Sequence, residues 1–276
     1  MRLLKMIKHD CIEGVAKRSI YYVLPIIVSL ISCMSLELNI ISENRMANVS
    51  MHGNVMDYWI YMILGNKPYK PDFTNLFHIP MAWMGFYCFL LIGTNNYIEK
   101  DLSRNGFQMI LCAKSRLIWW TSKVLWLCIY SVFYFLICGI TVMSYVIFHH
   151  GSIKSLPDAD IMELIGATHL CGVPGWQIKL LCIGVPALFM LMLGILQMFL
   201  SLMVGSMQSF MAMFGVMVAS TYHSSVWLPG NWGILRRSSV IIKSGISLKC
   251  SVSLMCVMIL LGLVGGYCLF RRKDIL

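Results

Sequence analysis

Charged side chains of alternating sign occupy one short segment of an otherwise apolar chain. Residues 96–104 read Asn-Tyr-Ile-Glu-Lys-Asp-Leu-Ser-Arg, so acids and bases follow one another between apolar residues. Asn96 followed by Glu99 is typical of a helix N-terminus of the capping-box type. Such a helix would offer charges to another protein, whereas a solvated loop explains the same residues without any function.

The chain contains residue types that can act in catalysis, but not at the spacings of known catalytic motifs. The chain contains no H-E-x-x-H, no G-x-S-x-G and no pair of aspartates within an apolar run. A phosphate-binding G-x-x-x-x-G-K-[ST] loop is also missing, so we expect no ATP hydrolysis by this chain. The seven histidines show no metal-ligand spacing, and His149 and His150 simply end an apolar run. We therefore expect a protein that is not an enzyme and holds no cofactor or metal.

Composition places the chain in a membrane. Hydrophobic residues make up 58% of the 276 residues and charged residues 12%, with a mean hydropathy of +0.74. Soluble domains carry about 25% charged residues. We expect one polytopic, all-α membrane domain over residues 1–276, with its net charge of +10 reflecting topology and not nucleic-acid binding. Residues 1–19 hold five Lys/Arg and no long apolar core, which argues against a cleaved signal peptide.

Most of the eleven cysteines lie inside apolar runs and show no C-x-x-C spacing. We interpret them as unpaired, small, membrane-buried side chains.

Apolar runs of about 18 residues or more predict six transmembrane helices. The expected spans are Ile20–Leu38, Leu76–Thr94, Leu117–Phe148, Ile178–Val204, Ser209–Leu228 and Cys250–Phe270. At 1.5 Å per residue the third reaches about 45 Å, beyond the ~30 Å hydrocarbon core, so it is expected to tilt or to extend into the cytoplasm.

Polar and small residues within these spans carry further expectations. No Asp, Lys or Arg lies well inside any span, and Glu37 sits at the outer edge of the first. Gln197 either bonds a neighbouring helix or lines a pathway, and the helix contact is favoured. Pro186 predicts a kink in the fourth span, and Gly262 with Gly266 predicts close helix packing in the sixth.

Basic residues set the expected orientation, with both termini in the cytoplasm. Thirteen of the 22 Lys/Arg then fall on the inner side, and the Arg-Arg-Lys after the last span is the clearest anchor. Trp119, Trp120 and Lys123 are one turn apart at the inner end of the third span, where interface anchors occur.

Two segments that do not span the membrane have patterns of their own. Residues 2–16 carry apolar residues on one helical face and charges on the other, which predicts an amphipathic helix on the inner membrane surface. A cytoplasmic extension of the first span is the alternative. Residues 229–249 are half apolar and broken by Pro229 and glycines, which predicts a re-entrant or interfacial hairpin on the outer side.

The chain resembles the permease subunits of ABC exporters of the ABC-2 type. The resemblance covers nearly the whole chain and rests on the amphipathic stretch 3–15, the charged connection 95–116 and the broken segment 229–246. The ending Phe270-Arg271-Arg272-Lys273-Asp274-Ile275-Leu276 is also similar to that family. Residues 228–232 resemble permeases that protect bacterial producers from their own peptide antibiotics, although the outer loop 41–73 is longer than in those proteins.

This resemblance implies a half-transporter in a bacterial plasma membrane. Two permeases, identical or different, would enclose a pathway for a hydrophobic or amphipathic cargo, and separate ATP-binding subunits would supply the energy. The matching positions imply an ATPase-coupling helix made of Glu99, Lys100, Asp101, Leu102, Ser103 and Arg104. The residues also allow a membrane scaffold or immunity protein without a transport cycle. A secondary carrier is less favoured because intramembrane ions are missing from the spans, and a membrane enzyme least of all.

Overall fold

A computed structural model describes residues 2–17, 19–48, 50–69, 77–103, 115–242 and 244–272. Within these ranges the chain is helical, and the only extended pairing is two isolated bridges, which confirms the all-α class. The α-helices are α1 (Arg2–Cys11), α2 (Val23–Ala47), α3 (Val55–Leu64), α4 (Met81–Thr94), α6 (Arg116–Phe148), α7 (Ala159–Leu164), α8 (Gly175–Lys179), α9 (Val185–Val204), α10 (Ser206–Tyr222) and α11 (Leu248–Arg272).

Four helical stretches among these residues are long and apolar enough to cross a membrane. They are Ile20–Ala47, Arg116–Phe148, Gly175–Val204 and Leu248–Arg272, and they contain the first, third, fourth and sixth expected spans. Many of their apolar side chains face outward, including Ile31, Phe133 and Leu260 at 60%, 47% and 60% exposure. A surface of this kind is suited to lipid, so the chain is a membrane protein.

The second and fifth expected spans correspond to shorter helices. Helix α4 has 14 residues and α10 has 17, which gives about 21 Å and 26 Å against a ~30 Å hydrocarbon core. Pro80 disfavours a helical residue before it, so α4 begins only at Met81, and Leu76 lies outside the described residues. Helix α10 ends at Tyr222, six residues before the expected end, because the backbone becomes extended at His223.

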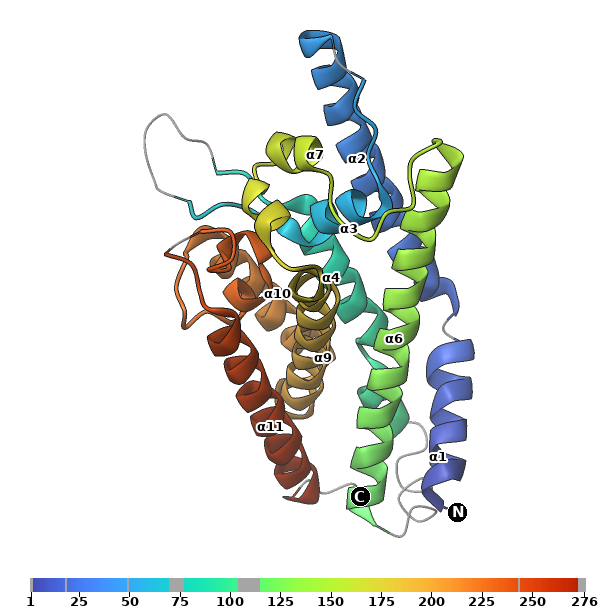
Figure 1. Ribbon diagram of the computed structural model, residues 1–276. Helices are drawn as coiled ribbons and strands as arrows, with labels where there is room; N and C mark the ends of the chain where they lie inside the picture. Colours follow the sequence, from blue (N-terminus) through green and yellow to red (C-terminus); the bar gives the residue numbers. More distant parts are fainter. Residues whose placement is uncertain are drawn as a thin grey trace.

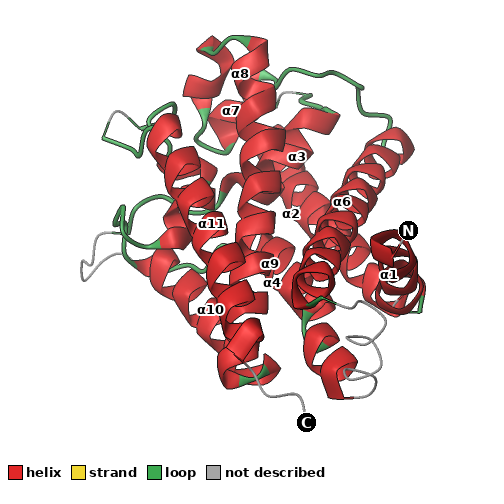
Figure 2. Cartoon of the chain, turned by 90° about the horizontal axis from the view of Figure 1, so that it is seen from below, coloured by secondary structure: helices red, strands yellow, loops and turns green. Residues whose placement is uncertain are grey.

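The helices form one bundle with α9 at its centre. Helix α9 contacts α4, α6, α10 and α11, while α2 packs against α4 and α6. Figure 2, seen from below, places α9 and α4 inside the ring of the other long helices. Helix α1 begins and α11 ends at the same end of the bundle, as the blue and red ends of Figure 1 show. This arrangement puts the charged residues 97–103 at that same end.

Near Pro186, where the sequence predicts a kink, a π-helical turn over Leu180–Gly184 comes just before α9. Proline has no N–H, so it cannot bond the carbonyl of Cys182 four residues earlier. The indole Nε1 of Trp59 in α3 donates to that carbonyl instead, at 2.7 Å. The irregularity therefore fastens α3 to the start of α9.

Gly262 and Gly266 lie on the buried face of α11, as their spacing predicts. A Cβ at Gly262 would come within 2.8 Å of Ile195 in α9, and one at Gly266 within 2.3 Å of the Trp120 ring in α6. Small residues at these positions allow α11 to approach both neighbours.

The N-terminal segment is helical as expected, with α1 continued by a π-helical turn over Ile12–Ala16. Its placement differs from a helix lying flat on a membrane surface, because α1 runs alongside the first half of α6 (Figures 1 and 2). Met6, Asp10 and Gly14 are buried against other helices. One face of α1 thus packs on protein. An amphipathic pattern alone does not distinguish a protein surface from a membrane surface.

In the described part of residues 229–249, for which the sequence predicts a re-entrant or interfacial hairpin, the backbone forms short turns. These residues contain two short 3₁₀ turns, Pro229–Gly233 and Leu235–Arg237, and a bridge that pairs Ser238 with Ile246. Trp232, Ile234 and Leu235 are buried and belong to the main core. The half-apolar pattern therefore reflects a compact cap that packs on α9, α10 and α11.

Arg237 fixes this cap to the C-terminal end of α10. Its guanidinium donates to the carbonyls of Ser220 and Thr221 and to the side-chain oxygens of Asn66 and Asn231. Burial lowers the pKa of Arg237 to about 10, so it stays charged at neutral pH. A cation at this position complements the negative end of the helix dipole.

Candidate functional site

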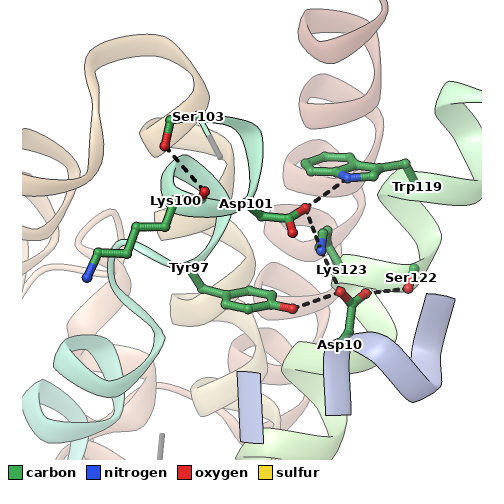
Figure 3. A network of polar contacts seen from close by, with 8 residues as sticks. All are labelled: Asp10, Tyr97, Lys100, Asp101, Ser103, Trp119, Ser122 and Lys123. Carbon is green, nitrogen blue, oxygen red and sulfur yellow. Dashed lines mark hydrogen bonds and ion pairs between the residues drawn. The ribbon is translucent and has the colours of Figure 1, made fainter. Parts of the chain in front are cut away.

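Two carboxylates and one ammonium group from three different elements meet inside the bundle. Lys123 of α6 places its Nζ 2.6 Å from Oδ1 of Asp10 in α1 and 2.8 Å from Oδ2 of Asp101 in the helical turns of 97–103 (Figure 3). The side chains of Lys123 and Asp10 are 0% exposed and that of Asp101 is 7% exposed. We refer to these three residues as the buried ion cluster.

Neutral donors complete the hydrogen bonds of both carboxylates. The hydroxyl of Tyr97 donates to Oδ1 of Asp10 at 2.7 Å, and Ser122 donates to Oδ2. The indole Nε1 of Trp119 donates to Oδ2 of Asp101 at 3.1 Å. Each carboxylate therefore has at least two donors, as buried charges require.

The rings of Tyr97 and Trp119 also face the ammonium group of Lys123. Nζ lies 4.7 Å from the Tyr97 ring centroid and 5.3 Å from that of Trp119, within the range of cation–π contacts. The three charged groups carry a formal sum of −1, so these donors and rings stabilise a site that still holds excess negative charge. Such a site is costly to open, because removing one partner leaves buried charge uncompensated.

Lys123, Trp119 and Trp120 do not lie at the bundle surface, where interface anchors would be. All three are buried, since this face of α6 points toward α1 and α11. Trp119 stacks on Phe270 with centroids 4.2 Å apart, and Trp120 donates its Nε1 to the Leu263 carbonyl at 3.0 Å. The aromatic residues thus join α6 to the end of α11.

Glu99 is turned toward the N-terminus of α10. Its Oε2 accepts the backbone N–H of Ser206 at 2.9 Å, and the Ser206 hydroxyl contacts both Glu99 and Asn96. A carboxylate at this place satisfies a free N–H and faces the positive end of the helix dipole. The segment that carries Glu99 is therefore attached to the turn between α9 and α10.

Gln197 makes the interhelical contact that its position in an apolar helix favours. Its Nε2 donates to the Leu91 carbonyl of α4 at 3.1 Å and to Oδ1 of Asn95 at 3.3 Å. Through Asn95, residues 95–103 reach α9 as well.

Residues 95–103 consequently touch α1, α6, α9 and α10 through side-chain hydrogen bonds and ion pairs. Glu99, Lys100 and Ser103 are exposed, and Figure 3 shows Lys100 pointing away from the buried ion cluster. Leu102 is half-buried against the core. Arg104 lies outside the described residues. The outward surface of the expected coupling helix thus consists of fewer residues than its sequence suggests.

A cleft of about 650 Å³ opens on one side of the bundle. Its walls come from α2, α4, the end of α3 and α10, and are mostly apolar, with Ile31, Met81 and Phe214 among the exposed side chains at its edge. We refer to it as the lateral cleft. Its volume falls within the range of small-molecule sites.

Asp10 and the depth of Lys123 are the features that sequence interpretation missed. Lys123 lies seven residues inside α6, about 10 Å along the helix, which is deep for a side chain expected at an interface. Asp10 is one of two acids, with Glu13, on the amphipathic stretch 2–16. A lysine ammonium group so far inside a membrane helix needs a carboxylate partner. This requirement could have indicated that Asp10 or Asp101 pairs with Lys123.

Among the described residues, no group of three or more His, Cys, Asp or Glu could hold a metal ion, and the ten cysteines in these ranges are free. No family model, curated protein or solved structure matches the chain.

Proposed function

We propose that this chain is the permease subunit of an ATP-driven exporter, and that separate ATP-binding subunits dock at the end where residues 97–103 lie. The observation that carries the proposal is the ion pair of Lys123 with Asp10 and Asp101. It ties one short surface segment to α1 and to α6, the helix of 33 residues. A displacement of that segment by a partner would move α1 and α6 with it.

The other contacts of residues 95–103 extend this connection. Glu99 is bonded to the start of α10 and Asn95 to Gln197 of α9. Helix α10, with α2 and α4, lines the lateral cleft. A push on the exposed surface around Lys100 and Ser103 therefore has a covalent and hydrogen-bonded path to the wall of the cleft.

The lateral cleft supports a hydrophobic or amphipathic cargo. Its apolar walls and its opening between exposed apolar side chains fit a molecule that arrives from the membrane. A second permease, identical or different, would complete a pathway.

In this proposal the protein crosses a bacterial plasma membrane six times, with α4 and α10 as the short second and fifth crossings. Nine of the 14 residues of α4 are buried by protein, so this helix needs little lipid contact of its own. The basic residues of α1 and the end of α11 lie at one end of the bundle, which we assign to the cytoplasm. Labelling of cysteines introduced at Lys100 and Lys154 tests this assignment, since only opposite sides agree with it.

A gradient-driven carrier is the second candidate, favoured by the same buried ion cluster. Ionisable groups inside a membrane bundle are the usual ligands of transported protons or sodium ions. The satisfied donors around Asp10 and Asp101 suit a fixed connection better than a site that gains and loses a cation in each cycle.

Reconstitution separates the two functions. The chain is purified in mild detergent with its ATP-hydrolysing partner, and uptake of a fluorescent amphipathic peptide into proteoliposomes is measured with ATP or with an ion gradient. The exporter proposal expects transport with ATP only, and loss of ATPase association in Lys100→Glu with Lys154→Glu as the matched control. Transport by the chain alone with a proton or sodium gradient would overturn it.

A further inference from the structure

The lateral cleft has a basic end. Arg236, from the turn Leu235–Arg237, lines the cleft together with His78. A Cβ at Gly166 would lie 3.3 Å from Lys67 Nζ and 3.8 Å from Arg236 Nη2, so two cationic groups flank this one glycine. Positive charge therefore gathers where the cleft approaches the end of the bundle remote from α1.

Arg236 has unused hydrogen-bonding capacity at this place. Its Nη2 donates to the Ile165 carbonyl, but its buried Nε has no acceptor. In the part of the chain that the structure describes, no carboxylate forms an ion pair with Arg236 or Lys67. A guanidinium that is partly buried without an acid is complementary to an anionic group.

The remainder of the cleft is mostly apolar, although Tyr61 and Asn66 also line it. Ser32 and Ser35 of α2 add hydroxyls to walls that are otherwise formed by side chains such as Val28, Phe89 and Phe214. Ile31, Met81 and Phe214 at its edge are exposed to 60%, 74% and 39%. In a membrane these edges meet lipid chains, so a ligand can enter sideways without crossing water.

We propose that the lateral cleft binds an acidic membrane lipid, with the anionic headgroup on Arg236 and an acyl chain between α2, α4 and Phe214. Charge complementarity selects the anion, and the apolar walls select a lipid over a soluble phosphate. The cleft volume of about 650 Å³ accommodates part of such a molecule. Binding needs neither nucleotide nor a partner chain, so the inference goes beyond the exporter proposal and can fail or hold independently of it.

Native mass spectrometry of the purified full-length chain tests the proposal. The detergent-solubilised protein is titrated with phosphatidylglycerol and with phosphatidylcholine of the same acyl chains. We expect a preference for phosphatidylglycerol, which falls about tenfold in Arg236→Gln and is largely kept in Arg236→Lys. Arg45→Gln, which removes an exposed arginine outside the cleft, is the matched control and keeps the preference.

A second variant guards against misfolding of Arg236→Gln. Ala82→Phe places a ring in the cleft wall and is expected to reduce binding of both lipids. Equal binding of the two lipids by the wild type, an unchanged preference in Arg236→Gln, or undiminished binding in Ala82→Phe would each overturn the proposal. Inorganic phosphate that competes fully with the lipid would also overturn it, because the site would then not require an acyl chain. If the chain shows no lipid selectivity but ATP-driven transport persists, the lipid site is wrong and the exporter proposal stands.

Discussion

The ammonium group of Lys123 lies 2.8 Å from the carboxylate of Asp101, although the two residues belong to different elements of the bundle. Lys123 is on the longest helix, α6, and Asp101 is in the short helical turns that follow α4. The charge pattern of this segment suggests a surface that faces solvent, but the ion pair links the segment to α6 inside the bundle. Glu99, Lys100 and Ser103 remain exposed in that segment, and a docking partner would meet these residues first.

Lys123→Met is expected to destabilise the protein by about 3–5 kcal/mol, because Asp10 and Asp101 would be left as buried charges without a cation. The unfolding midpoint in detergent measures this effect. Lys100→Met removes a neighbouring exposed lysine and is expected to change stability little. The triple variant Asp10→Asn, Asp101→Asn and Lys123→Met should recover part of the loss. Equal midpoints for Lys123→Met and Lys100→Met would contradict the buried ion cluster.

Glu99→Ala is expected to loosen the first turn of α10 at a cost of about 1 kcal/mol, since the Ser206 N–H loses its carboxylate acceptor. Hydrogen exchange at residues 206–209 reports this directly. The adjacent Lys100→Ala serves as control. Unchanged exchange at Ser206 in Glu99→Ala would show that the contact does not cap the helix.

Gly266→Ala is expected to destabilise the contact of α11 with α6, because the new Cβ would lie 2.3 Å from the hydrogen-bonded ring of Trp120. Gly215→Ala in α10 meets no atom within 4 Å and should be neutral or slightly stabilising, as helical Gly→Ala changes are. Thermal unfolding of the pair in the same detergent compares them. Identical behaviour would mean that α11 does not pack on Trp120.

Asp57, at the start of α3, predicts a local pH dependence. Burial raises the pKa of Asp57 to about 6, against the opposing effect of N–H donors from Asn54 and Asp158. Because the folded pKa exceeds the unfolded value of about 3.9, its contribution to stability is full below about pH 4 and is lost as the pH rises through about 6.

Unfolding midpoints between pH 4 and 7.5 test this expectation. Asp57→Asn should flatten that part of the profile while keeping an acceptor for one of the two N–H groups. The exposed Asp160→Asn is the control and should follow the wild-type profile. A wild-type profile that Asp57→Asn leaves unaltered would refute the assignment.

The sequence by itself determined the membrane class and the four long apolar helices, because a stretch of some 20 apolar residues has few alternatives to a lipid-facing helix. Gly262 with Gly266 and the irregularity near Pro186 were predictable for a similar reason, since small size and a missing N–H act locally.

Only the tertiary structure decided which charges meet. Asp10 and Lys123 are 113 residues apart, and no periodicity relates one helix face to another across that distance. The same physical limit explains why Glu99 and Asp101 were expected to face a partner yet bond within the chain. The amphipathic sequence of α1 predicts only that one of its faces avoids water. The tertiary structure shows that this face packs on α6.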